Sequence, residues 1–200
     1  MPSRPTPEID SLIRQTAQKY GIAYELLYCQ VKQESGFNPL AVSRCGAQGL
    51  LQIMPDTWND LTGKRHGAPI TNDIYDPEHN LEYGARYLKR QYTAVKRQIT
   101  LMPKAIPDFK GGPAKQVVNE CTEDDYWRLG LAAYNGGLGY ILRATNMCIG
   151  IGRPDSLPMC WSNIAICLTD PGCKVMGEHP DHAQIIHYVE TIWTNYGGMI

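Results

Sequence analysis

The longest run of apolar residues at helical spacing, residues 75–98, constrains the fold more than any other part of the sequence. Asp76 stands where a helix N-cap is expected, and Pro77 follows at the first helical position, where proline is well tolerated. Five apolar side chains recur three or four residues apart and would share one helix face: Leu81, Ala85, Leu88, Tyr92 and Val95. We therefore predict one long amphipathic helix over this segment.

Most of the remaining chain also has helical patterning, so the predicted fold class is all-α. A first helix has Thr6 as its expected N-cap and Gly21 as its stop. The other predicted helices are 24–35, 50–54 ending at Pro55, 56–63 capped by Asp56, 122–135 capped by Thr122, 140–145 and 181–198. We find no convincing pair of strands. The chain is expected to be a single domain, residues 1–200, with loop insertions at about 100–121 and 145–180.

The composition limits the possible functions. The 200 residues carry a formal net charge of −1 and no block of Lys or Arg, so we expect no nucleic-acid partner bound through its phosphates. No stretch approaches the roughly 20 apolar residues of a membrane span. Residues 1–10 lack an apolar core, so we expect no secretory signal peptide here and either its removal or another route out of the cell.

The sequence contains seven cysteines: Cys29, Cys45, Cys121, Cys148, Cys160, Cys167 and Cys173. No two have the CxxC spacing of zinc motifs, so a zinc site has little support. Disulfides within 148–173 would staple a cysteine-rich loop that has little core of its own. The odd number leaves at least one thiol free or paired outside the chain, and an oxidised and a fully reduced set both stay open. A Cys29–Cys45 bridge would pin helix 24–35 to the following loop.

Glu34 places a carboxyl group at the end of an apolar helix face. Leu27, Val31 and Glu34 are four and three residues apart, so they share the face that packs inward. Burial disfavours the charged form, and we expect a raised pKa for Glu34. Cleavage of a glycosidic bond needs such an acid, because the leaving oxygen must be protonated. The alternative is a surface Glu at a helix C-terminus.

An ordered series of motifs surrounds Glu34. It runs through ESGFNP from Glu34, GAQGLLQIMP from Gly46, DPEHN from Asp76, AYNGG from Ala133 and YV at Tyr188. The series resembles the soluble lytic transglycosylases, whose lysozyme-like (goose-type) catalytic domain cleaves peptidoglycan. It spans about residues 9–196, nearly the whole chain. One departure is AYNGG, where the family usually has AYNAG.

The resemblance implies that Glu34 is the single catalytic acid. It would protonate the oxygen between N-acetylmuramic acid and N-acetylglucosamine. It would then act as the base on the 6-hydroxyl of the muramic acid, which gives a 1,6-anhydro product without consuming water. An ordinary glycosidase uses two carboxylates, and we find no second catalytic acid in the matched motifs. Asp56 and Asp60 are interpreted as a helix cap and a surface residue.

Six further residues match substrate-side positions of the family: Ser43, Gln52, Met54, Tyr134, Asn135 and Tyr188. Ser43 would polarise substrate groups near the acid, or it is only a turn residue. Gln52 would bind substrate, since a buried amide inside an apolar run needs partners. Met54 would form a wall of the cleft or pack in the core.

The remaining three lie in the C-terminal half of the sequence. Tyr134 would lie close to the acid. Asn135 would hold the sugar or the local loop, or it caps the C-terminus of its helix. Tyr188 would line the cleft or belong to the core.

We expect neither a metal nor a cofactor, because the five histidines do not form an HExxH motif. The expected partner is the glycan strand of peptidoglycan, with a virion tail or a secretion apparatus as candidate protein partners. The expected place of action is the bacterial cell wall or periplasm. A phage lysis or virion-associated enzyme and a bacterial periplasmic enzyme are the two settings. A lysozyme- or chitinase-like hydrolase and an inactive cell-wall-binding module are the alternative functions.

Overall fold

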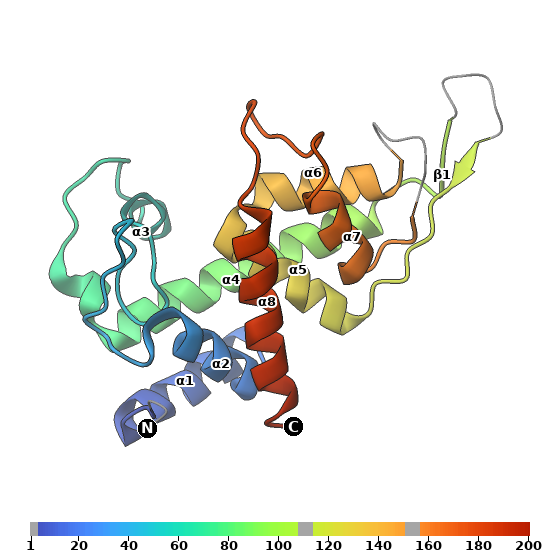
Figure 1. The fold of residues 1–200 in the computed structure, drawn as a ribbon. Helices are drawn as coiled ribbons and strands as arrows, with labels where there is room; N and C mark the ends of the chain where they lie inside the picture. Colours follow the sequence, from blue (N-terminus) through green and yellow to red (C-terminus); the bar gives the residue numbers. More distant parts are fainter. Residues whose placement is uncertain (1–3, 108–113, 151–156) are drawn as a thin grey trace. The chain divides into compact units, whose positions relative to one another are not determined.

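The structure is a computed structural model that describes residues 4–107, 114–150 and 157–200 (Figure 1). In these residues eight α-helices, one short 3-10 helix and one two-stranded sheet form. In chain order they are α1 (Pro7–Tyr20), α2 (Tyr24–Ser35), α3 (Pro55–Thr62), η1 (Asn72–Tyr75), α4 (Pro77–Thr100), β1 (Ala105–Ile106), β2 (Lys115–Gln116), α5 (Glu123–Gly136), α6 (Leu138–Cys148), α7 (Trp161–Leu168) and α8 (His182–Gly197). The all-α class is therefore confirmed, with one small sheet as an exception.

The chain divides into two compact units. The first unit contains Met1–Lys89 and Glu190–Ile200, and the second contains Arg90–Val189. The boundaries fall inside α4 and α8, so each of these helices contributes residues to both units. That residues 1–200 form a single domain stays a prediction.

In the first unit, polar side-chain contacts join α1 to α2 and to α4. The Tyr24 hydroxyl donates to Asp10 Oδ1 at 2.5 Å, and the Arg14 guanidinium lies 3.7 Å from the centre of the Tyr24 ring. Lys19 Nζ donates to Glu82 Oε1 at 2.7 Å, and the Tyr20 hydroxyl donates to the same oxygen. Below these contacts the unit buries an apolar core: Ile13, Leu26, Leu27, Leu50, Leu51, Trp58, Ile74 and Leu81.

The predicted helix ends agree well with the observed ones in this unit. Thr6 Oγ1 accepts from the backbone N–H of Ile9 at 3.3 Å, and Gly21 closes α1 with a φ of 60°. At the start of α4, Asp76 Oδ1 accepts from the backbone N–H of His79 at 2.9 Å. These contacts satisfy backbone groups that a helix leaves without partners at its ends.

The predicted helix 50–54 is wrong. This segment is a tight turn whose ends pair, with Gln48 and Ile53 exchanging two backbone hydrogen bonds of 3.0 and 2.9 Å. Helix α3 begins only at Pro55, with Met54 at its N-cap position. Asp56 is therefore not the cap, and its Oδ1 accepts instead from the backbone N–H of Gly67 at 3.2 Å.

The second unit packs α6 against both α5 and α7. The prediction of a plain loop over 145–180 is wrong, because α6 continues to Cys148 and α7 forms inside this region (Figure 1). This part also has its own core: Met147, Cys148, Met159, Trp161, Ile164, Cys167, Leu168 and Cys173. The expected absence of strands is wrong too, since β1 and β2 pair antiparallel with Ala105 opposite Gln116.

Asp125 links the starts of two helices in the second unit. Its Oδ2 accepts from the backbone N–H of Thr122 at 2.8 Å and from the Thr122 hydroxyl at 2.7 Å, which completes a capping box on α5. Its Oδ1 accepts from the backbone N–H of Trp161 at 2.9 Å, at the start of α7. Burial raises the pKa of Asp125, but these hydrogen bonds outweigh it, and the pKa is lowered overall.

Replacing Asp125 tests this link. We expect Asp125→Ala to lower the free energy of unfolding by about 2–3 kcal/mol, because three hydrogen bonds lose their acceptor. Urea denaturation measures the change. Asp124→Ala, which removes an exposed acid from the same helix turn, is the matched control and should cost about 0.5 kcal/mol or less.

The same series has an expected pH dependence. The folded pKa of Asp125 lies below the ordinary value of about 3.9 for aspartate. The ionised Asp125 therefore stabilises the folded protein fully at pH values above the ordinary pKa of aspartate. This stabilisation is lost as the pH falls through the lowered pKa of the folded state. The difference between wild type and Asp125→Ala should shrink in acid, and a difference that grows there would contradict the assignment.

Candidate functional site

Glu34 is the next-to-last residue of α2 and is half-buried. Leu27 and Val31, on the same helix face, are fully buried, as the spacing predicted. The helix ends because Gly36 adopts a left-handed φ of 58° and its N–H donates to Lys32 O. Glu34 thus stands, half-buried, at the end of a helix face whose other members lie in the apolar core of the first unit. The raised pKa expected for Glu34 stays a prediction.

Gln52 lies in the turn that precedes α3. Its backbone has a φ of 46°, a left-handed conformation that is uncommon for residues other than glycine. The side chain stabilises the turn, because Nε2 donates to Gly49 O at 2.9 Å and to Ala41 O at 3.2 Å. A strained residue held by its own side chain is typical of functional sites. The amide has the partners that its place among apolar residues required.

Asn80, on α4, holds this turn from the other side. Its Oδ1 accepts from the backbone N–H of Leu51 at 2.8 Å, and its Nδ2 donates to Ile74 O at 2.8 Å and to Gln48 O at 3.2 Å. The side chain is fully buried. Gly49 allows this approach, since an added Cβ would lie 2.1 Å from Asn80 Nδ2. We assigned no role to Asn80 from the sequence, although an amide next to Leu81 on the buried face of a helix was a usable signal.

Ser43 and Met54 lie at the two ends of the segment that contains the turn. Ser43 is exposed, and its Oγ accepts from the backbone N–H of Ala47 at 3.0 Å, which closes a small loop. This contact agrees with the turn alternative and leaves a substrate role untested. Met54 is 44% exposed, so in this structure it is a surface residue and does not pack in the core.

Asp56 and Asp60, the nearest acids to the QIMP motif, share a partner on the surface of the first unit. Asp60 Oδ1 lies 2.9 Å from His66 Nε2, and Asp56 Oδ2 lies 3.7 Å from His66 Nδ1. The side chains of the two acids are 55% and 62% exposed. Both acids thus form an exposed cluster around one histidine.

Tyr134 and Asn135 lie in the last turn of α5, in the second unit, and both are half-buried. Asn135 is inside the helix, and the C-cap is Gly137 with a φ of 96°, so the capping alternative for Asn135 is wrong. Its Oδ1 is buried and accepts no hydrogen bond from the described residues. Burying a carbonyl oxygen without a hydrogen-bond donor costs free energy. Asn135 Oδ1 is therefore a candidate to accept a hydrogen bond from a ligand.

Tyr188 is on α8, which packs closely against the end of α5. An added Cβ on Gly136, at the end of α5, would lie 2.1 Å from Ile185 Cδ1 on α8. The glycine therefore lets α8 touch the end of the helix that carries Tyr134 and Asn135. Tyr188 is one turn further along α8 and is 5% exposed. This burial agrees with the core alternative for Tyr188 and leaves its cleft-lining role a prediction.

The predicted site residues thus form two sets. Glu34, Ser43, Gln52 and Met54 belong to the first unit, and Tyr134, Asn135 and Tyr188 belong to the second unit. Within the first set, the structure explains how the turn at Gln52 is held. Within the second, it brings the α5 end and α8 into contact.

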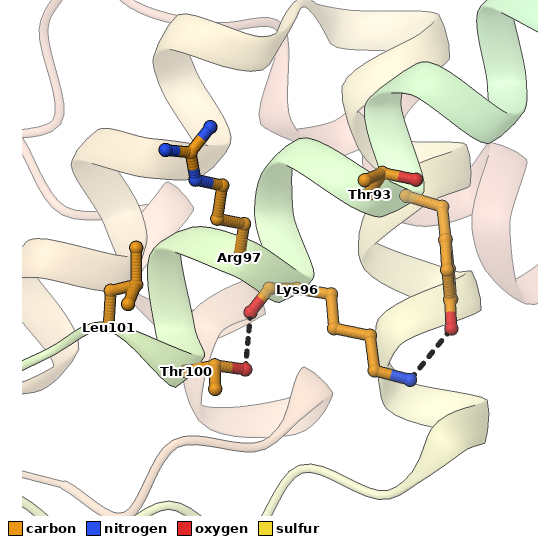
Figure 2. A pocket seen from close by; sticks show the side chains of 6 residues that line it. Thr93, Lys96, Arg97, Thr100 and Leu101 are labelled. Carbon is orange, nitrogen blue, oxygen red and sulfur yellow. Dashed lines mark hydrogen bonds between the residues drawn. The ribbon is translucent and has the colours of Figure 1, made fainter.

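A separate pocket of about 480 Å³ lies along the C-terminal half of α4 in the second unit: its lining is Tyr92, Thr93, Lys96, Arg97, Thr100 and Leu101 (Figure 2). Lys96 Nζ donates to the Tyr92 hydroxyl at 2.8 Å and to Glu123 Oε2 at 2.6 Å. These bonds, to Glu123 first, raise the pKa of Lys96. The lining contains no carboxylate and none of the predicted site residues, so this pocket has no acid for glycosidic chemistry.

In the described part of the chain, no group of three or more His, Cys, Asp or Glu side chains is arranged to hold a metal ion. None of the described helices combines the length and apolarity that crossing a membrane requires.

Comparisons with known proteins agree with the motif series. The family model described as the transglycosylase SLT domain matches residues 11–147. Membrane-bound lytic murein transglycosylase C of Mannheimia succiniciproducens is 32% identical over 140 residues, which are 66% of this chain and 32% of that protein. The protein of the same name in Yersinia pestis is 31% identical over 148 residues, 70% of this chain and 35% of the relative. The chain thus spans about a third of the length of these relatives.

Two solved structures share the fold. An inactive mutant of lytic transglycosylase Slt from Pseudomonas aeruginosa matches with a TM-score of 0.58 and 18% identity, over 94% of this chain and 24% of that chain. The soluble lytic transglycosylase of Escherichia coli matches with a TM-score of 0.56 and 21% identity, over 93% of this chain and 23% of that chain. The predicted lysozyme-like fold is therefore confirmed.

Replacing Asn80 tests how the turn of the first unit is held. Asn80→Ala removes three hydrogen bonds to the backbone, from Leu51 N–H and to Ile74 O and Gln48 O, so we expect the free energy of unfolding to fall by about 2–4 kcal/mol. The backbone N–H of Leu51 should exchange with solvent faster than in wild type. Glu78→Ala, an exposed change on the same helix, should stay within about 0.5 kcal/mol of wild type. Unchanged exchange at Leu51 would show that the turn does not depend on Asn80.

Replacing Gly136 tests the contact between α5 and α8. We expect Gly136→Ala to destabilise by about 1–3 kcal/mol through overpacking against Ile185. Ile185→Ala in the same chain should relieve part of this clash, so the two losses should not add. Gly197→Ala is the control, because nothing lies within 4 Å of its added Cβ. Strictly additive losses in thermal unfolding would mean that the two residues do not meet.

Proposed function

Because the chain belongs to the transglycosylase SLT domain family, we propose that it is a peptidoglycan lytic transglycosylase. It would cleave the β-1,4 bond between N-acetylmuramic acid and N-acetylglucosamine and leave a 1,6-anhydro end. The proposal depends most on Glu34, a carboxyl group at the end of α2 on a face with buried Leu27 and Val31, inside the region that the family model matches. The names of the relatives, lytic murein transglycosylases, support it.

In the proposed reaction Glu34 acts twice. It first gives its proton to the glycosidic oxygen, and the N-acetylglucosamine leaves with that proton as its new hydroxyl. The resulting carboxylate then takes the proton of the muramic acid 6-hydroxyl, and the 6-oxygen bonds to the anomeric carbon. Glu34 ends protonated, as it began, and no water is consumed. Positioning of the 6-hydroxyl within the same sugar makes this an intramolecular step, which favours it over attack by water.

A single acid suffices for this chemistry, and the surroundings of the nearby acids agree with that. Hydrolysis by the usual route needs a second carboxylate as base or nucleophile. Asp60 and Asp56 are both largely exposed and face His66, which supports a surface role for them.

The remaining candidate residues would hold the sugar. Gln52 uses its Nε2 to stabilise its own turn, which would leave Oε1 as the end that accepts from a substrate N–H or hydroxyl. Asn135 has a buried Oδ1 that accepts nothing from the described residues, and a sugar amide or hydroxyl would satisfy it. We further propose that Tyr134 and Tyr188 line the cleft, and that Ser43 and exposed Met54 border it.

The proposed place of action is the bacterial cell wall, where peptidoglycan is found. Delivery by a phage particle, or partnership with a virion tail or secretion apparatus, stays a prediction. Isolating the protein from its source and identifying the proteins bound to it tests this setting independently of the proposed reaction.

The products of peptidoglycan digestion test the proposal. We expect the wild type to release disaccharide-peptides that are lighter by one water than the products of a hydrolysing muramidase. Glu34→Gln should lose activity by about a thousandfold or more, because the amide cannot donate or accept the reacting proton. Mass spectrometry of digests of purified cell walls reads both results.

Glu25→Gln is the matched control, since it makes the same change at the other end of α2. It should keep nearly full activity. Products with ordinary reducing ends would instead indicate a hydrolase on this fold, and Asp56→Asn and Asp60→Asn would then be the variants that identify its base. A folded wild type that binds cell walls but releases nothing would indicate a binding module.

A further inference from the structure

Five of the seven cysteines lie in the second unit and gather around α6 and α7: Cys121, Cys148, Cys160, Cys167 and Cys173. None of the seven cysteines forms a disulfide in this structure. In the first unit, Cys29 is buried with its Sγ 3.4 Å from Met199 Sδ, whereas Cys45 is exposed. The predicted Cys29–Cys45 bridge is therefore absent, and the arrangement in the second unit is the informative one.

Cys148 and Cys167 meet in the core of the second unit. Cys148 is the last residue of α6, Cys167 is on α7, and both are fully buried where these helices pack together. Their side chains are hydrogen-bonded to each other. Carbonyl oxygens lie nearby, with Leu157 O and Pro158 O each 3.6 Å from Cys148 Sγ. Because the two thiols are already in contact and their helices pack together, a disulfide bond between them needs little backbone movement.

Cys121 and Cys160 lie where two extended segments pair. Asn119 and Met159 form a parallel bridge, with Glu120 N–H donating to Met159 O at 2.9 Å. Cys121 Sγ lies 3.3 Å from that same Met159 oxygen, which belongs to the peptide bond joining Met159 to Cys160. Both cysteines are half-buried. The pairing of the backbones thus brings the Cys121 thiol to the backbone of Cys160, and Cys160 is one of the groups that raise the pKa of Cys121.

We propose that Cys148–Cys167 and Cys121–Cys160 are two disulfide bonds of the mature protein. In each pair, two thiols give up two protons and two electrons, and one S–S bond forms. A disulfide oxidant, such as oxidised glutathione or the active-site disulfide of a thiol oxidase, accepts them and becomes two thiols. The pairing leaves Cys29, Cys45 and Cys173 as free thiols, which accounts for the odd number.

The two bonds would fasten the region that departs most from the family motifs. One joins the chain just before α5 to the start of α7, and the other joins the end of α6 to α7. Both constrain the helices that pack against α5, which carries Tyr134 and Asn135. Because a disulfide restricts the unfolded chain, the second unit would be most stable in an oxidising compartment. Burial raises the pKa of the Cys121 thiol to about 12, which slows its reaction once the reduced protein has folded.

Peptide mapping of the full chain tests the pairing. The protein is refolded with a mixture of reduced and oxidised glutathione, then unfolded without reductant and alkylated with iodoacetamide. Cleavage before aspartates and after aromatic residues places these five cysteines on separate peptides, since Tyr126, Asp155, Trp161 and Asp170 lie between successive cysteines. We expect the two linked pairs and three alkylated cysteines. Seven alkylated cysteines, or a different pairing such as Cys167–Cys173, would overturn the proposal.

Thermal unfolding tests the consequence. Reduction with dithiothreitol should lower Tm by roughly 5–15 °C, and Cys160→Ser should remove part of that fall while leaving Cys121 open to alkylation. Cys45→Ser is the control, because an exposed cysteine outside both pairs should leave the redox-dependent shift unchanged. If Cys160→Ser does not fold, Cys121→Ser tests the same bond from the other side. Equal Tm values for oxidised and reduced wild type would contradict a stabilising role.

Discussion

The buried amide of Asn80 is the interaction on which the arrangement of the first unit depends. One side chain on α4 satisfies three backbone groups of the chain that precedes it, from Gln48, Leu51 and Ile74. The turn that leads into α3, in which Gln48 already pairs with Ile53, is thereby fixed to a long helix. Gln52 then closes the turn from inside in a strained conformation, which is acceptable only because the surroundings determine it.

Much of the fold could be predicted because helix ends are local events. At the starts of three helices, a capping side chain accepts a hydrogen bond from a backbone N–H of the first turn: these caps are Thr6, Asp76 and Thr122. A short stretch of sequence therefore contains the whole interaction. The inward face of α2 was predictable for the same reason, since Leu27 and Val31 recur at helical spacing. Glu34 could be singled out because it continues that face.

The failures lie where distant residues decide the structure. The apolar run LLQIM has helical composition, but its Leu51 N–H donates to Asn80 Oδ1, 29 residues further along the chain, and the run forms a turn. The cysteine-rich region contains a helix because Asp125 accepts from the backbone N–H of Trp161 and because α7 packs on α6. Similarly, only the close approach of Ile185 explains why a glycine must stand at position 136. Such contacts leave no short-range pattern in the sequence.

The central claim is that Glu34 serves as acid and then as base, so that the sugar's own hydroxyl, rather than water, closes the reaction. The most direct measurement is digestion of purified peptidoglycan in water enriched in a heavy oxygen isotope, followed by mass spectrometry of the released disaccharide-peptides. With this mechanism, no heavy oxygen is expected at the new muramic acid end. One heavy oxygen atom per cleavage at that end would contradict it, because water would then have attacked the anomeric carbon.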